Sequence, residues 1–224
     1  MMDPDKVYSI FLKWAFWLVL WTGTLLIIWS SRDYLPGPFT HDFLLERPYL
    51  LHQNWWRISV KVHAISGCLC LASSLLQYSG LLLKKYPKVH KSLGYVYIAS
   101  LLFVVVPSGL ILCTVAKGGL ISQIGFFVMN LLTLLTVFLG LNSILNGKIK
   151  EHQIWITRSF GLVSSAITFR TLLIVLLVSQ VPLEVAYPAC VWLSMIINAL
   201  LVEFYLYQAS SQPKQKSTTT DRVA

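Results

Sequence analysis

The chain has 224 residues, of which 56% are hydrophobic and 12% are charged, and its formal net charge is +9. This composition excludes an ordinary soluble domain, in which about a quarter of the residues are charged. The basic charge does not indicate nucleic-acid binding, because most of the cations lie in short segments between apolar stretches.

Six apolar stretches fill most of the chain: 14–30, 58–83, 93–115, 119–146, 157–181 and 184–207. A helix needs ~20 residues to cross a hydrocarbon core of ~30 Å, and the last five stretches exceed that length. The first stretch reaches the lower limit and lacks an A-x-A-like cleavage site, so we interpret it as a retained signal anchor. The sequence therefore predicts an all-α bundle of six transmembrane helices over 1–208, followed by a disordered cytoplasmic tail over 209–224.

Lysines and arginines are distributed unevenly between these stretches. Twelve lie on the side of the two termini: Lys6, Lys13, Lys84, Lys85, Lys88, Lys91, Lys148, Lys150, Arg158, Lys214, Lys216 and Arg222. Five lie on the other side: Arg32, Arg47, Arg57, Lys61 and Lys117. The positive-inside rule then predicts that both termini are cytoplasmic and that loop 31–57 is outside.

Polar side chains at membrane depth are costly and indicate functional sites. At ~1.5 Å per residue, His63 lies ~8 Å below the outer edge of the bilayer and Arg170 lies ~10 Å below it. Pro107 in the third stretch indicates a kink beside a cavity. We therefore expect a ligand-binding site in the outer half, formed by His63, Arg170, Asn130 and Ser108. A structural alternative stays open, in which these groups tie helices together by hydrogen bonds.

A second polar group is expected at the inner face, as a ligand or cofactor site: His90, His152, Arg158 and Gln77. We place His90 at the end of the second loop and His152 just before the fifth stretch, so both lie in or near loops. Two histidines at one face can serve as axial ligands of haem, whereas the alternative is that both are simply solvated. His63 is ~20 Å or more from this face, so the three histidines do not converge on zinc.

Small residues on the second stretch and four cysteines add less information. Gly67, Cys70 and Ser74 recur at a spacing of three to four residues, which predicts close helix packing. Cys113 and Cys190 both fall near the outer edge, where a disulfide between the third and sixth stretches is one alternative to free thiols.

Taken in order, several short patterns resemble an uncharacterised membrane family, domain of unknown function number 2306. They are His63-x-x-x-Gly67, Gln77, His90-Lys91-x-x-Gly94-x-x-Tyr97, Pro107-x-Gly109-Leu110, Gly118-Gly119, His152-x-x-Trp155-x-x-Arg158-Ser159-Phe160 and Arg170. The resemblance covers about 60–171. It implies a multi-spanning membrane architecture and supplies no assigned reaction.

Three classes of function remain open. The leading hypothesis is a polar intramembrane site for a small redox-active ligand, either haem b or a quinone-like molecule. The second is a transporter or proton-coupled carrier of a small polar or anionic solute. The third is a structural or assembly subunit without chemistry of its own. The expected partners are the lipid bilayer and a small molecule, with no nucleic acid, and the sequence does not decide whether the protein is an enzyme.

Overall fold

The computed structural model describes residues 4–34 and 48–211, and these residues are helical nearly throughout. The elements follow one another in this order: α1 (Pro4–Ser31), η1 (Arg32–Tyr34), α3 (Pro48–Leu51), α4 (Asn54–Gln77), α5 (Gly80–Lys85), α6 (Pro87–Ser100), η2 (Leu101–Val105), α7 (Val106–Cys113), α8 (Gly119–Leu145), α9 (Ile149–Val178) and α10 (Leu183–Ser211). The element η1 is a 3-10 helix and η2 is a π-helix. No strand occurs in the two described ranges, which confirms the all-α prediction for them.

Six helical segments within the described residues are long and apolar enough to cross a membrane: Trp14–Ser31, Asn54–Gln77, Pro87–Cys113, Gly119–Leu145, Ile149–Val178 and Leu183–Ser211. Their outward faces are strongly apolar, and Phe103 and Leu145 are each 76% exposed. Water disfavours such surfaces, whereas lipid accommodates them. The six predicted stretches are therefore confirmed as helices.

The boundaries of two spans differ from the predicted ones. The apolar stretch 58–83 is broken, because α4 ends at Gln77 and the short helix α5 begins at Gly80. The Ser79 side chain caps α5 by accepting a hydrogen bond from the backbone N–H of Leu82. In addition, α9 begins at Ile149, well before residue 157, because polar residues extend this helix beyond its apolar part.

The predicted tail, 209–224, also begins differently. Helix α10 continues to Ser211, so the first residues of this segment are helical. The remainder of the predicted tail lies outside the described residues.

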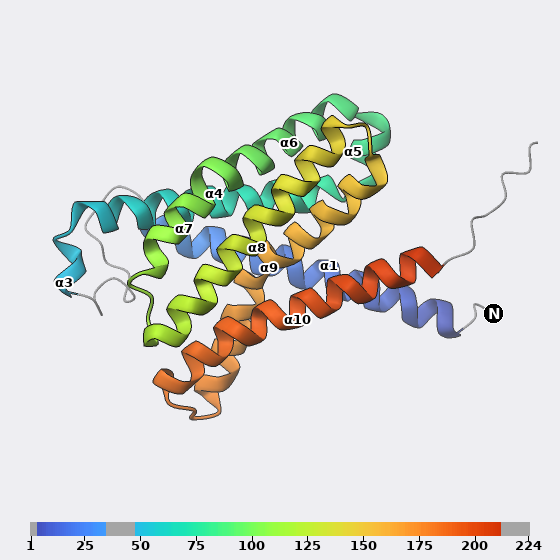
Figure 1. Ribbon diagram of the computed structural model, residues 1–224. Helices are drawn as coiled ribbons and strands as arrows, with labels where there is room; N and C mark the ends of the chain where they lie inside the picture. The colour runs from blue at the N-terminus through green and yellow to red at the C-terminus, as the bar shows by residue number, and fades with distance from the viewer. Residues whose placement is uncertain (1–3, 35–47, 212–224) are drawn as a thin grey trace, which may run out of the picture.

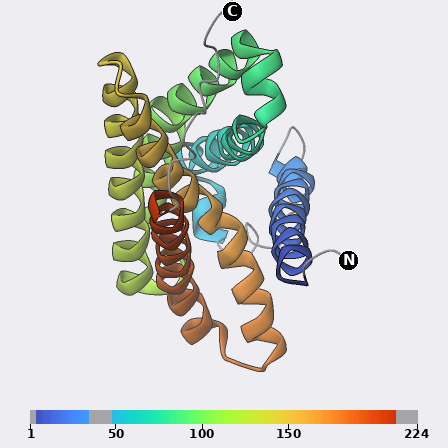
Figure 2. The same cartoon turned by 90° about the vertical axis from the view of Figure 1, so that its right-hand side faces the viewer.

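The helices form one bundle with two distinct ends (Figure 1). Helix α3 and the α7–α8 and α9–α10 connections lie at one end, called the α3 end, whereas α5 and the α8–α9 connection lie at the other, called the α5 end. Helix α9 packs chiefly against α10 and α8, and α4 packs against α6, α7 and α1. Helix α1 contacts α4 and α9 and stands at the edge of the bundle (Figure 2).

Polar side chains tie the helices together inside the bundle. The Tyr97 hydroxyl and the Ser159 Oγ lie 2.8 Å apart, which joins α6 to α9. Asn198 on α10 donates through Nδ2 to Ser165 Oγ at 3.1 Å and to Thr168 Oγ1 at 3.0 Å on α9. Interhelical bonds of this kind contribute about 0.6 kcal/mol each in membrane proteins. Together with the packing of α9, they hold the bundle in a defined register.

The orientation of the bundle can be tested by labelling in intact cells. The first turn of α1 and the last turn of α10 lie at the same end (Figure 1), which the positive-inside rule predicts to be cytoplasmic. We expect a membrane-impermeant maleimide to label Gln53→Cys, which lies near the α3 end, and not Ser217→Cys. The wild-type chain gives the background from its native thiols. Labelling of position 217 without labelling of position 53 would reverse the predicted orientation.

Candidate functional site

All six spans border one cavity of about 520 Å³, which lies toward the α3 end. Most of its lining is apolar, and its volume falls within the range of about 300–1,000 Å³ that suits a small organic ligand. The larger polar or charged side chains that line it are Tyr34, His63, Lys117, Asn130, Arg170 and Tyr187, and smaller hydroxyl groups come from Ser30, Ser31, Thr133, Ser165 and Ser194. An apolar cavity with a few converging polar groups is the usual form of a small-molecule site.

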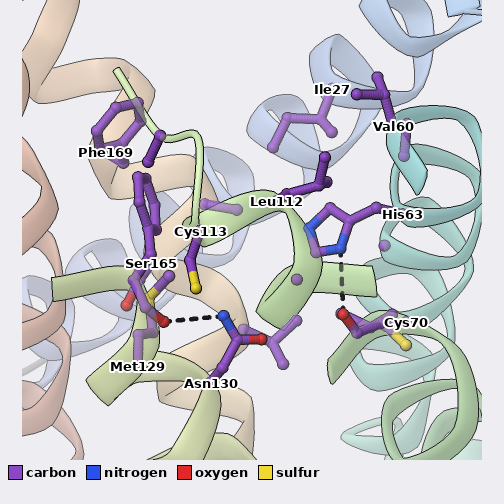
Figure 3. Close-up of a pocket in the computed structure, with 18 of the residues that line it drawn as sticks. Ile27, Val60, His63, Cys70, Leu112, Cys113, Met129, Asn130, Ser165 and Phe169 are labelled. Atoms are coloured by element: carbon purple, nitrogen blue, oxygen red, sulfur yellow. Dashed lines mark hydrogen bonds between the residues drawn. The ribbon is translucent and has the colours of Figure 1, made fainter. Parts of the chain in front are cut away.

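His63 reaches the cavity from α4 (Figure 3). Its Nδ1 lies 3.1 Å from the carbonyl oxygen of Val105 and 3.1 Å from Ser108 Oγ. Because a carbonyl can only accept a hydrogen bond, Nδ1 carries the proton when the ring is neutral. Nε2 is then the unprotonated nitrogen, and in Figure 3 it points away from this bond, toward the space that the labelled residues surround.

The carbonyl that receives His63 belongs to an irregular turn of the third span. Leu101–Val105 form a π-helix immediately before α7, whose second residue is Pro107. Proline has no N–H to donate into the preceding turn, and π-helical turns are frequent at functional sites. Ser108 Oγ donates to the carbonyl of Val104 at 2.5 Å and so stays able to accept from His63. This turn therefore fixes the tautomer and the direction of the His63 ring.

Arg170 lines the cavity from α9. Its Nη1 donates to the carbonyl of Ala166 on the same helix, at 2.9 Å. Among the described residues no Asp or Glu forms an ion pair with Arg170. The residue keeps accessible surface where it lines the cavity, and its charge lies close enough to act on the His63 ring. The guanidinium therefore retains donors for a ligand in the cavity.

Asn130 borders the cavity from α8 and also serves a helix contact. Its Nδ2 donates to the carbonyl of Phe126 at 2.8 Å, a bond drawn in Figure 3. Its Oδ1 lies against Gly109 of α7, where a Cβ atom would collide with it. Glycine at position 109 thus makes room for the amide between α7 and α8. The amide of Asn130 supports the wall of the cavity as well as facing it.

The side chains of the cavity that carry a charge at neutral pH share one sign. Arg170 and Lys117 both line it, and none of the described residues that line it is acidic. Low-dielectric walls strengthen the field of such cations inside a cleft. The cavity therefore favours a carbonyl oxygen or an anion over a cationic group.

Gly67 and Lys117 line the cavity but were not among the predicted site residues. The spacing of small residues predicts a helix contact at Gly67, and this prediction is wrong, because nothing lies within 4 Å of a Cβ built there. Gly67 instead lines the cavity, a difference that spacing alone does not reveal. The sequence predicts Lys117 only as one of the cations on the outer side. It reaches the cavity beside a tight turn at Gly118, whose φ of 85° favours glycine, and the Gly118-Gly119 pair is the signal for that turn.

The predicted inner-face residues gather at the α5 end. His90 and His152 lie in the first turns of α6 and α9, next to the loops, because α6 begins at Pro87 and α9 begins at Ile149. Gln77 Nε2 donates to the backbone carbonyl of His90 at 2.6 Å and ties α4 to α6. His152 Nδ1 lies 2.7 Å from the carbonyl of Gly140 on α8.

Arg158 is separate from this histidine pair in its contacts. Its guanidinium forms a two-point ion pair with Glu203 of α10, with Nε–Oε1 at 2.6 Å and Nη2–Oε2 at 3.0 Å. The same guanidinium lies 4.7 Å from the centre of the Trp155 ring. Arg158 is therefore engaged in holding α9 to α10, which leaves it fewer donors for a ligand than the sequence suggests.

All four cysteines are free, so the disulfide between Cys113 and Cys190 does not form. Within residues 4–34 and 48–211, no three His, Cys, Asp or Glu side chains gather as a metal site.

Comparisons with known proteins identify the chain at the level of a family. No curated protein and no solved structure matches it. A family model described as predicted membrane protein (DUF2306) matches residues 60–206, which covers α4 from its first turns to most of α10. Helix α1 lies outside the matched region, although it lines the cavity through Ile27. Since the match spans well over half of the 224 residues, the protein belongs to the DUF2306 family of predicted membrane proteins.

Proposed function

We propose that this multi-spanning membrane protein binds a small apolar ligand with a carbonyl or anionic head group, of the quinone type, in the cavity of His63 and Arg170. One observation carries the proposal: both residues line a single, mainly apolar cavity in which no described lining residue is acidic. An isolated arginine at membrane depth costs about 2.5–3.5 kcal/mol, so its presence calls for a stabilising partner.

The two side chains have complementary roles in this proposal. The Arg170 guanidinium donates hydrogen bonds to the head group of the ligand, since its Nη1 bond to Ala166 leaves other N–H groups available. His63 presents Nε2, which accepts a proton or a hydrogen bond from a hydroxyl form of the ligand. The apolar walls hold the ring and tail. A carbonyl-bearing ring that gains hydroxyl groups on reduction suits such a pair.

A transporter of a small anionic solute is the second candidate, favoured by the positive lining of the same cavity. The two functions differ in what crosses the membrane. Uptake of a labelled anion into proteoliposomes, with no saturable quinone binding, would select transport. Saturable quinone binding without uptake would select the proposed function. If the protein showed neither binding nor uptake, an assembly role would be the remaining candidate.

Filling the cavity tests the proposed function by a single substitution. Gly67→Leu adds a side chain where a Cβ meets nothing within 4 Å, so it narrows the cavity without forcing helices apart. We expect the variant to fold and to bind a short-chain quinone at least ~10-fold more weakly, which corresponds to about 1.4 kcal/mol. Quenching of tryptophan fluorescence in detergent measures the affinity, because Trp56 lines the cavity.

Gly80→Leu is the matched control for this experiment. Its Cβ also meets nothing within 4 Å, but Gly80 opens α5 and does not line the cavity. This variant should bind the quinone as the wild type does. Equal affinities of the wild type and of Gly67→Leu would place the ligand elsewhere and refute the proposed site.

A further inference from the structure

The two histidines at the α5 end are brought together by the register of α6 and α9. Both helices begin at this end and run toward the α3 end (Figure 1), so they are parallel. The buried Tyr97–Ser159 hydrogen bond of 2.8 Å fixes their relative height. His90 precedes Tyr97 by seven residues, and His152 precedes Ser159 by seven residues. Seven residues are about two helical turns, or ~10.5 Å, and return nearly to the same face. Both rings therefore come to about one level, on the sides of α6 and α9 that the Tyr97–Ser159 bond joins.

The contacts of the two rings agree with this placement. They lie close enough for a charge on one to act on the other. The Nδ1–H of His152 donates to the carbonyl of Gly140 at 2.7 Å, which leaves Nε2 as the unprotonated nitrogen. A metal-binding histidine usually donates its other ring N–H to a carbonyl or carboxylate oxygen in this way, which fixes the orientation of the ring.

His90 contributes an unsatisfied atom. Its Nδ1 is buried and has no hydrogen-bond partner among the described residues. A buried polar atom without a partner costs about 1–3 kcal/mol and needs an explanation, such as a bound ion. Gln77 Nε2 on α4 donates to the backbone carbonyl of His90 at 2.6 Å, and this bond fixes the backbone that carries the His90 ring.

We propose that His90 and His152 together ligate one transition-metal centre, each through one imidazole nitrogen. In the described part of the chain no third His, Cys, Asp or Glu joins the pair. A closed zinc site needs four protein ligands, so this set does not suit structural zinc. Two imidazoles would suit haem iron or a single monovalent copper ion, since both metals accept imidazole ligands.

The charges around the pair narrow the choice of metal further. Lys88 and Lys91 flank His90. Lys148 and Lys150 precede His152, and Glu151 beside it pairs with Lys148 at 3.4 Å, so the net charge near the pair stays positive. Each histidine also lies near the start of a helix, where the backbone dipoles present positive charge. A bare divalent cation is disfavoured in such a field. Monovalent copper carries less charge, and the two carboxylates of haem would pair with lysines, so both fit the field better.

The metal content of the full-length protein tests this proposal. The protein is purified in detergent after expression with added haemin, and in parallel is titrated with monovalent copper against a competing chelator. We expect one equivalent of haem, seen as a Soret band and an α-band on reduction, or one equivalent of copper. His90→Ala and His152→Ala should each lower the occupancy at least ~10-fold, because the two ligands act as a pair.

Control variants separate loss of ligands from loss of fold. His52→Ala replaces an exposed histidine near the α3 end and should leave the occupancy unchanged. If an alanine variant fails to elute as a monodisperse species, His90→Gln and His152→Gln retain polar side chains of similar size and replace it. Binding of neither haem nor copper by the wild type would overturn the proposal, as would full occupancy in folded variants of both histidines.

Discussion

Arg170→Leu is expected to abolish quinone binding while the protein remains folded in the membrane. The hydrogen bond from Arg170 to the Ala166 carbonyl lies within its own helix, so the loss of that bond disconnects no helix from another. Leucine also relieves the cost of a charge at membrane depth. Each charge-assisted hydrogen bond to the ligand contributes about 1.5–3 kcal/mol, so the loss of two weakens binding at least ~100-fold. Binding is measured by fluorescence quenching, and folding by thermal stability in detergent.

Arg170→Lys separates the guanidinium group from its charge. Lysine keeps the charge but does not reproduce a planar fork of five donors, so we expect binding to stay weak. Full binding by the lysine variant would show that charge alone is needed. Loss of the leucine variant from the membrane would show instead that Arg170 holds the bundle together, and the ligand-binding role would be wrong.

Gly161→Leu is expected to prevent assembly of α9 against α10. A Cβ at position 161 would collide with Val202 Cγ2 at 2.5 Å and would already contact the Asn198 carbonyl oxygen at 3.5 Å, so we expect the larger leucine side chain to push the two helices apart. Over-packing a core costs about 1–3 kcal/mol, and separation of the helices would also weaken the bonds from Asn198 to Ser165 and Thr168. The variant should aggregate or disappear from the membrane fraction.

The same substitution at Gly67 provides the comparison for this result. Gly67 and Gly161 both lie within transmembrane helices, but only the second has neighbours within 4 Å of a Cβ. We expect Gly67→Leu to reach the membrane in normal amount, as judged by immunoblot and by size-exclusion chromatography. A folded Gly161→Leu protein would contradict the observed closeness of α9 and α10.

The sequence predicts the spans well because length and hydropathy determine whether a helix crosses a bilayer. It does not predict the break after Gln77, since the apolar stretch continues on both sides of Ser79 and Gly80. Nor does it show that α9 starts at Ile149, because the apolar pattern begins near residue 157 and the helix includes the polar residues before it.

The candidate site is predicted in part for a similar reason. Counting residues along helices places His63 and Arg170 at one depth, and the structure places both on one cavity. Depth does not give the rotation of a helix, so the open space at Gly67 and the contribution of Lys117 emerge only from packing. At the α5 end, the ion pair of Arg158 with Glu203 likewise depends on how α9 and α10 face each other.

Photoaffinity labelling with an azido-substituted short-chain quinone tests the central claim most directly. The protein is labelled in proteoliposomes, and the modified residues are identified by mass spectrometry of its peptides. We expect labels on cavity residues of α4 and α9, such as Cys68 and Phe169, and their loss in the presence of excess unlabelled quinone. Labels spread over outward-facing residues such as Phe103 and Leu145, unaffected by the competitor, would contradict a binding site in the cavity of His63 and Arg170.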